Sequence, residues 1–293
     1  MRFPLRFSSL PVCLFLGITG IRAQISLVDD LQRPIVLPRP ATRIVSLAPS
    51  ITESLFAIGA GDQVVGVTEY CNYPPEAQSR RHVGGMINPS IETIVGLQPD
   101  LILFSMEGNQ RQDFTILTAL HVPAFVTNPR NLDDINRSLL QLGILTGHRR
   151  EAMALTDSLA RRAALLKAHI GPVRTRTLLF VSVQPLVAVG VRTFLNELLV
   201  DAGGDNLAAS TGLTYPPMSR EVVLRQDPAV LLIASDVLDS AQSIAALYPE
   251  WSRLSAVREN RVYRVNADLI SRPGPRAVDG LATLITYLQT GHP

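Results

Sequence analysis

One uninterrupted helical pattern near the middle of the chain sets the strongest limit on its fold. The run from Arg149 to His169 contains neither glycine nor proline. Its basic residues include Arg161 and Lys167, and its apolar side chains recur every three or four residues, at Ala152, Leu155, Leu159, Ala163 and Leu166. This spacing predicts a single amphipathic helix of about 20 residues, about 30 Å long. The pair Gly171-Pro172 ends it.

Short apolar runs alternate with amphipathic runs on both sides of this helix. Before it, the sequence predicts strands at 43–47, 63–67 and 100–104 and helices at 50–58 and 91–97. After it, the predicted elements are strands at 177–183 and 261–265 and a final helix at 277–288. This alternation is typical of an α/β protein with mostly parallel strands. Ser50 and Glu53 have the spacing of a capping box for the helix at 50–58.

The two halves of the chain share an internal echo. Residues 90–92 read Ser-Ile-Glu and are followed, after six residues, by Pro99 and an apolar strand. Residues 219–221 read Ser-Arg-Glu and are followed, again after six residues, by Pro228 and an apolar strand. Two lobes built on related plans explain this repetition. The alternative is convergence, because serine caps helices and proline ends them.

The first 23 residues have the pattern of a cleavable signal peptide. Arg2 and Arg6 give a positive start, the largely apolar run 10–21 follows, and Ala23 precedes the expected cleavage site. The apolar run is shorter than the roughly 20 residues that span a bilayer, and an uncleaved interfacial anchor is the alternative. We therefore expect the protein to be exported. Cys71 would then be the mature chain's only thiol, without an internal disulfide.

Composition and missing motifs exclude several classes of function. The net charge is +2, and the arginines are scattered along the chain, so we expect no nucleic-acid partner. The sequence has no phosphate-binding loop, no Gly-x-Ser-x-Gly, no His-Glu-x-x-His and no tight metal-ligand spacing among its five histidines. We expect no metal, no cofactor and no catalysis. The enzymatic alternative would use Cys71 as nucleophile and His82 as base.

Several motifs together resemble a known family. Residues 43–53 read RIVSLAPSITE, 70–75 read YCNYPP and 84–89 read GGMINP. In the second half, 215–221 read YPPMSRE and 271–276 read SRPGPR. In this order they resemble the class III periplasmic substrate-binding proteins, which deliver cobalamin, haem or ferric siderophores to ABC importers. The resemblance covers about residues 27–290, and the cobalamin-binding proteins are the most similar subfamily.

The resemblance implies an architecture and a function. The fold would be α/β, with two Rossmann-like lobes at 24–146 and 172–293 joined by one long rigid helix within 147–171. The ligand would lie in the cleft between the lobes. The protein would capture cobalamin or a related corrinoid and deliver it, as a monomer, to the permease dimer of an ABC importer in the inner membrane. A sensor that presents its closed form to a membrane receptor is an alternative to a carrier.

A corrinoid needs flat apolar walls and few polar anchors, and five residues are candidates to supply them. Tyr70 and Tyr215 would be walls, one from each lobe, and Met86 lies where cobalamin binders often have an aromatic ring. By resemblance, Arg272 and Asp268 would contact polar groups of the ligand. The alternatives are loop packing for the tyrosines and Met86, and a solvated surface position for Arg272.

Two glutamates are candidates for docking to the permease. By resemblance, Glu92 and Glu221 would pair with arginines on the two permease subunits, one from each lobe. Charges at a rim steer and orient docking while adding modest affinity. The alternative is local, because a carboxylate in the first turn of a helix is stabilised by the helix dipole.

The sequence also departs from the cobalamin-binding pattern. Ser105 stands where some relatives have tryptophan, Val187 replaces another ring, and aromatic residues make up only 5%. A ferric siderophore carrier is therefore an alternative, and it would use cleft arginines drawn from Arg111, Arg220, Arg272 and Arg276. Haem is the weaker rival, because His82 is the only histidine or tyrosine near Gly85 and Met86. We interpret Trp251 as a packing residue.

Overall fold

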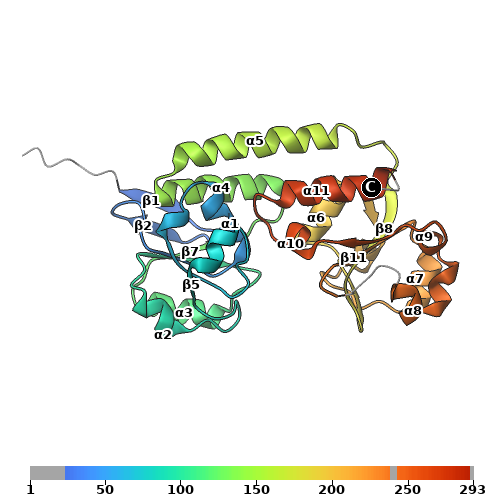
Figure 1. Ribbon diagram of the computed structural model, residues 1–293, viewed down its shortest axis with the longest axis horizontal. Helices are drawn as coiled ribbons and strands as arrows, with labels where there is room; N and C mark the ends of the chain where they lie inside the picture. The colour runs from blue at the N-terminus through green and yellow to red at the C-terminus, as the bar shows by residue number, and fades with distance from the viewer. Residues whose placement is uncertain (1–23, 238–242, 291–293) are drawn as a thin grey trace, which may run out of the picture.

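The computed structural model describes residues 24–237 and 243–290 and has two α/β lobes side by side (Figure 1). The N-terminal lobe holds β1–β7 and α1–α4, and the C-terminal lobe holds β8–β12 and α6–α11. Helix α5 (Arg149–Lys167) runs along the top of the view from one lobe to the other. The proposed signal peptide, residues 1–23, lies outside the described residues.

The N-terminal lobe is built on a parallel sheet. Its strands lie in the order β5 (Arg81–His82), β4 (Val64–Val67), β3 (Ile44–Ser46), β6 (Leu101–Ser105) and β7 (Ala124–Thr127). Strands β3, β6 and β7 are buried along their whole length, because helices cover both faces. One face packs with residues of α1 (Pro49–Ala57) and α4 (Leu132–Thr146), the other with residues of α2 (Ile91–Gly96) and α3 (Arg111–Ala119). An antiparallel pair, β1 (Ile25–Val28) and β2 (Pro34–Leu37), completes the lobe.

The C-terminal lobe has a similar sheet. Parallel strands lie in the order β10 (Gly204–Asn206), β8 (Thr175–Val183), β11 (Val230–Ala234) and β12 (Val262–Val265), and β9 (Leu186–Ala188) pairs antiparallel with β8. The helices are α6 (Phe194–Asp201), α7 (Arg220–Gln226), α8 (Ser243–Leu247), α9 (Ser255–Arg258), α10 (Ala267–Ser271) and α11 (Ala277–Ile285). Trp251 is fully buried and packs on the rings of Phe180 and Tyr248, which confirms its interpretation as a packing residue.

The predicted long helix is confirmed, and it ends at Lys167, two residues before the expected limit. It packs along α4, an element that the sequence analysis did not predict. Gly143 of α4 permits this contact, because a Cβ there would lie 2.5 Å from the Cβ of Ala152. Ion pairs Arg162–Asp279 and Lys167–Asp201, each at 2.6 Å, fix α5 to the C-terminal lobe. The helix thus packs against both lobes, and the exact lobe limits remain predictions.

The echo marks the same structural unit in both lobes. Ser90 and Ser219 cap α2 and α7, accepting hydrogen bonds from the backbone N–H of Thr93 and Val222 at 3.2 Å. These helices lead into β6 and β11, and each of these strands pairs with the first strand of its own sheet, β3 or β8. Both interpretations of the echo therefore apply: the serines cap helices, and the two lobes repeat the same helix–strand unit.

The predicted capping box at the start of α1 is wrong. The N-cap residue is Ala48, whose side chain makes no capping bond, and Pro49 occupies the first turn. A proline lacks an N–H and has a helical φ, so the helix begins one residue earlier than expected. Ser50 lies inside the helix, and the Glu53 carboxylate faces the other lobe instead of the helix start.

Among the residues that the structure describes, no helix has both the length and the apolar character needed to cross a membrane.

Candidate functional site

A cleft of about 680 Å³ lies where the two lobes face each other. The N-terminal lobe contributes the start of α1, the loops after β4 and β5, and the end of β6, through Pro49, Ser50, Tyr70, Met86, Ser105, Glu107 and Gly108. The C-terminal lobe contributes Val181, Leu195, Tyr215, Ser271, Arg272 and Pro273. The cleft therefore combines a largely apolar wall with a few polar groups, as small-molecule sites usually do.

The topology of the N-terminal sheet explains why the cleft forms here. Strands β3 and β6 are neighbours, but the chain leaves β3 toward β4 on one side and later returns to β6 on the other. Loops at the carboxyl ends of two such strands separate and leave a crevice. Ser50 follows β3, and Ser105 ends β6, so both reach the cleft.

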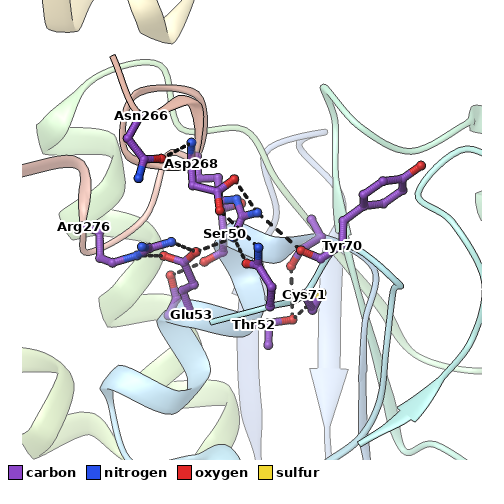
Figure 2. Close-up of polar contacts among 12 residues, drawn as sticks. Ser50, Thr52, Glu53, Tyr70, Cys71, Asn266, Asp268 and Arg276 are labelled. Atoms are coloured by element: carbon purple, nitrogen blue, oxygen red, sulfur yellow. Dashed lines mark hydrogen bonds and ion pairs between the residues drawn. The ribbon is translucent and has the colours of Figure 1, made fainter. Parts of the chain in front are cut away.

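Two tyrosines face the cleft from opposite lobes, where the sequence analysis expected them. Tyr70 is 59% exposed and Tyr215 is 45% exposed. Large apolar groups left exposed in a cleft are typical of a ligand-binding surface. Figure 2 shows the Tyr70 ring pointing away from the neighbouring polar cluster. These tyrosines are the aromatic part of the lining, and Met86, which also lines the cleft, is half-buried against the core.

The Tyr215 phenol has a distinct electrostatic environment. Burial against the cleft wall, and then the negative charge of Glu107, raise the pKa of Tyr215, while Arg130 acts in the opposite direction. The phenol is therefore neutral at physiological pH and can both donate and accept a hydrogen bond.

Arg272 lines the cleft but is held by several partners. Its Nη1 lies 2.9 Å from Glu53 Oε1 and donates to Asn72 Oδ1 at 2.7 Å. Its Nη2 lies 2.6 Å from Asp268 Oδ1. The side chain is only 13% exposed, so it is a fixed polar edge of the cleft and not a solvated surface arginine.

Glu53 is the centre of this polar cluster. Its side chain is 2% exposed and accepts from two arginines of the C-terminal lobe, Arg272 and Arg276 (Figure 2). The Arg276 guanidinium donates to both carboxylate oxygens and lies 3.9 Å from the Tyr73 ring centroid. The hydrogen bond with Glu53 raises the pKa of Arg276 despite its burial. This cluster ties the two lobes together beside the cleft.

Asp268 contacts Arg272 and does not itself line the cleft. It pairs with Arg272 and accepts a hydrogen bond from Asn72 Nδ2 at 3.2 Å, so it joins the lobe-bridging cluster. Among the residues that line the cleft, Asp268 is absent. The structure thus brings Asp268 and Arg272 together and positions Arg272 nearer to the cleft.

Asn109, which the sequence analysis missed, holds together the backbone beneath two residues of the cleft lining, Met86 and Ser105. Its Nδ2 donates to the carbonyls of Leu47 and Met86, each at 2.9 Å, and its Oδ1 accepts from the Ser105 N–H at 2.7 Å. One side chain therefore joins three backbone segments, including the end of β6. Glu53, Asn72 and Glu107 were also missed as members of the site, because their partners lie far away in the sequence.

Cys71 is a buried residue that packs in the core of the N-terminal lobe. Its side chain is 2% exposed, belongs to the apolar core, and contacts the hydroxyls of Thr52 and Thr68 at 3.2 Å (Figure 2). His82 is exposed on the edge strand β5. The described part of the chain holds no group of three or more His, Cys, Asp and Glu side chains that could bind a metal ion.

The arginines named for a siderophore do not gather in the cleft. Arg111 is exposed at the start of α3, and Arg220 lies over the ring of Tyr248 near the outer end of the C-terminal lobe. Arg276 is held by Glu53, and Arg272 alone of the four lines the cleft. Its charge is balanced by two carboxylates.

Glu92 and Glu221 lie exposed in the first turns of α2 and α7. These helices belong to different lobes and lie away from α5 (Figure 1). Hydrogen bonds from its own backbone N–H and from the Ser219 hydroxyl lower the pKa of Glu221, which keeps the carboxylate charged. Both carboxylates are therefore exposed, each in the first turn of a helix that lies away from α5.

Comparisons with known proteins place this fold and cleft in a family. The family model described as "Periplasmic binding protein" matches residues 44–269. The chain belongs to the periplasmic binding protein family. Its lobe-bridging helix and interlobe cleft are the class III arrangement of that family.

Curated members of the family with similar sequences are named vitamin B12-binding proteins. The one from Vibrio cholerae is 31% identical over 255 residues, which is 86% of this chain and 91% of that protein. The one from Pectobacterium carotovorum is 31% identical over 256 residues, which is 85% of this chain and 90% of that protein.

Solved structures of family members agree with the fold. The periplasmic vitamin B12-binding protein BtuF of Vibrio cholerae matches with a TM-score of 0.78 and 30% identity, covering 86% of this chain and 98% of that one. The periplasmic haem-binding protein RhuT of Roseiflexus matches with a TM-score of 0.76 and 27% identity, covering 84% of this chain and 97% of that one.

Proposed function

We propose that this periplasmic binding protein captures cobalamin or a related corrinoid and delivers it to an ABC importer. The observation that carries the proposal is the interlobe cleft with one tyrosine ring from each lobe. Aromatic rings contributed by both lobes suit a broad, flat macrocycle, and the cleft volume lies within the range of about 300–1,000 Å³ for small-molecule sites. The names of the similar curated proteins support the same ligand.

In this proposal, each cleft residue has a role. Tyr70, Met86 and Tyr215 form the apolar walls, and Tyr215 offers a neutral hydroxyl to an amide of the ligand. Arg272 is the polar anchor, held in position by Asp268 and Glu53. Because Arg272 is held by partners before any ligand is present, binding would order little additional side chain, which favours tight capture.

The protein would act by differential affinity and without chemistry. Exported by a signal peptide at 1–23, it would bind its ligand in the periplasm as a monomer and release it when the permease separates the lobes. Glu92 and Glu221 would dock on the two permease subunits, because they are charged, exposed and similarly placed in the two lobes. The burial of Cys71 argues against the enzymatic alternative, since a substrate could not reach its thiol.

Haem is the second candidate ligand, because the two cleft tyrosines could offer a phenol oxygen to ferric iron. The raised pKa of Tyr215 opposes this role, since it disfavours the phenolate. A ferric siderophore is favoured less, because Arg272 already pairs with two carboxylates and offers little net charge to an anionic chelate.

Calorimetric titration of purified residues 24–293 with cyanocobalamin, haemin and a ferric siderophore tests the ligand class. We expect one-to-one cyanocobalamin binding with submicromolar affinity and at least ten-fold weaker binding of the other two. Tight binding of haemin or the siderophore without cyanocobalamin binding would overturn the ligand and leave the family assignment intact.

A further inference from the structure

A second, more polar chamber adjoins the main cleft. It has a volume of about 630 Å³ and shares Glu107 with the cleft. The N-terminal lobe also contributes Arg130 and Asn131, and the C-terminal lobe contributes Arg192, Thr193, Glu197 and Thr214. The main cleft has an apolar wall, whereas every side chain named here is polar or charged. One ligand that fills both spaces must therefore have a flat apolar body and a polar arm.

We propose that this chamber binds the phosphodiester-bearing nucleotide arm of a complete corrinoid, so that the protein prefers complete corrinoids over those without the arm. This inference rests on the proposed function and names the part of the ligand that the chamber recognises. The arm carries one negative charge together with sugar hydroxyls, which need both donors and acceptors around them.

Arg192 is the residue best placed to meet the negative charge. It is exposed in the chamber, and one Nη2 hydrogen bond to the Gly212 carbonyl at 2.9 Å holds its guanidinium. Among the described residues, no ion pair engages Arg192. Arg130, in contrast, already pairs with Glu107. A guanidinium with an unused charge is well suited to a phosphodiester, which it can bind through two parallel hydrogen bonds.

The backbone of Arg192 has a left-handed conformation. Its φ is +61°, in the left-handed region that an arginine adopts only at a cost in free energy. The Nη1 of Arg130 donates to the Arg192 carbonyl at 3.2 Å, so the opposite lobe contacts this unusual turn. Guanidiniums from both lobes therefore line the same chamber.

The two guanidiniums and two carboxylates of the chamber cancel in formal charge, so the negative charge of the arm must be met locally. Glu107 and Glu197 are its carboxylates; Glu107 is paired with Arg130, and Glu197 accepts from Asn196 Nδ2 at 3.2 Å. Thr193 and Asn131 are the N-caps of α6 and α4, so two helix N-termini add partial positive charge. The acids and threonines can serve hydroxyls, while Arg192 and the helix ends favour the phosphodiester.

The test compares two corrinoids with the same macrocycle. Cyanocobalamin carries the nucleotide arm, and dicyanocobinamide lacks its phosphodiester, sugar and base. Both are titrated by calorimetry into the wild-type protein, Arg192→Gln, Arg192→Lys and the control Arg161→Gln, which removes an exposed charge from α5. Far-UV circular dichroism and thermal unfolding verify that each variant is folded.

We expect the wild type to bind cyanocobalamin about ten-fold more tightly than dicyanocobinamide, because one charge-assisted hydrogen bond contributes about this much to affinity. Arg192→Gln should lower the affinity for cyanocobalamin about ten-fold and the affinity for dicyanocobinamide less than two-fold. Arg192→Lys should retain part of the preference for cyanocobalamin. The control Arg161→Gln should change neither affinity. Equal affinities in the wild type, or an equal loss for both ligands in Arg192→Gln, would overturn the chamber assignment alone. Binding of neither corrinoid by the wild type would overturn the proposed function as well.

Discussion

Glu53 of the N-terminal lobe and Arg276 of the C-terminal lobe form a two-bond ion pair across the lobe interface. Arg276 Nε lies 2.8 Å from Oε2 and Nη2 lies 2.6 Å from Oε1. The same carboxylate also accepts from Arg272, which lines the cleft. Lobe association and the position of a cleft residue therefore depend on one buried group.

Removal of this carboxylate should destabilise the protein. Glu53→Ala leaves Arg272 and Arg276 without their shared acceptor, and loss of one partner of a buried pair typically costs about 3 kcal/mol or more of unfolding free energy. Urea unfolding followed by circular dichroism measures this loss. The matched control is Glu151→Ala, an exposed acid in the first turn of α5, which should change stability by less than about 0.5 kcal/mol. Equal stabilities of the two variants would contradict the role of Glu53.

The cleft tyrosines should contribute to corrinoid affinity through their rings. We expect Tyr70→Ala and Tyr215→Ala each to weaken cyanocobalamin binding about ten-fold, because each removes one wall of the cleft. Tyr70→Phe should bind almost as the wild type does, because the ring remains. Calorimetric titration measures these affinities. Unchanged affinity in both alanine variants would show that the rings only pack loops.

The exposed glutamates should matter for transport and not for ligand binding. Glu92→Ala combined with Glu221→Ala removes the two docking charges and leaves the cleft intact, so we expect uptake to be lost and cyanocobalamin affinity to be unchanged. Uptake of labelled cobalamin by cells that express the cognate importer measures the effect. The control, Glu76→Ala with Glu259→Ala, removes two other exposed acids. Normal uptake by the Glu92 and Glu221 double variant would refute the docking role.

Asp227 should contribute a pH-dependent part of the stability. It accepts from the Ser255 N–H and hydroxyl, both at 2.7 Å, and these hydrogen bonds lower its pKa below the ordinary 3.8. A lowered pKa stabilises the folded state above the unfolded-state pKa, and this contribution is lost as the pH falls through the folded-state pKa. Because the pKa of Asp227 is lowered, its contribution to the unfolding free energy should be lost only in acid.

Asp227→Asn tests this prediction, because asparagine keeps the size of the side chain and tolerates the left-handed backbone at this residue. At pH 6 we expect the variant to be about 1 kcal/mol less stable than the wild type, as for the loss of a helix cap. The difference should shrink as the pH is lowered from 4 toward 2. Urea unfolding at each pH gives the free energies, and a difference that grows in acid would contradict the assignment.

The helices and strands that the sequence analysis predicted were those with a strong local signal. The run at 149–169, free of glycine and proline, gave α5, and the buried apolar runs gave β3, β4, β6, β8 and β12. Helix α4 was missed although its signals are local: Asn131 caps it, Gly147 ends it, and Ile135, Leu139 and Leu142 recur at helical spacing. The start of α1 was shifted because Pro49 could occupy the first helical turn.

The same contrast applies to the site, where some residues were predicted from the sequence and their partners were not. Tyr70, Met86, Tyr215 and Arg272 were expected at the cleft from the family resemblance and from their residue types, and all four line it. The partners of Arg272 could not be found from spacing, because Glu53 and Asn72 lie 219 and 200 residues away along the chain. Ser50 and Glu53 fit a local capping box, but the Arg272 and Arg276 guanidiniums provide Glu53 with stronger, charged partners.

The sequence by itself determined the α/β class, the long helix and the repeated helix–strand unit, because these depend on periodicity and capping within a few turns of chain. Only the tertiary structure decided which polar groups share a space. The lobe-bridging Glu53 cluster and the polar chamber at Arg192 join residues of two lobes. Their contacts depend on how α5 and the two sheets place the lobes, and no local pattern encodes that distance.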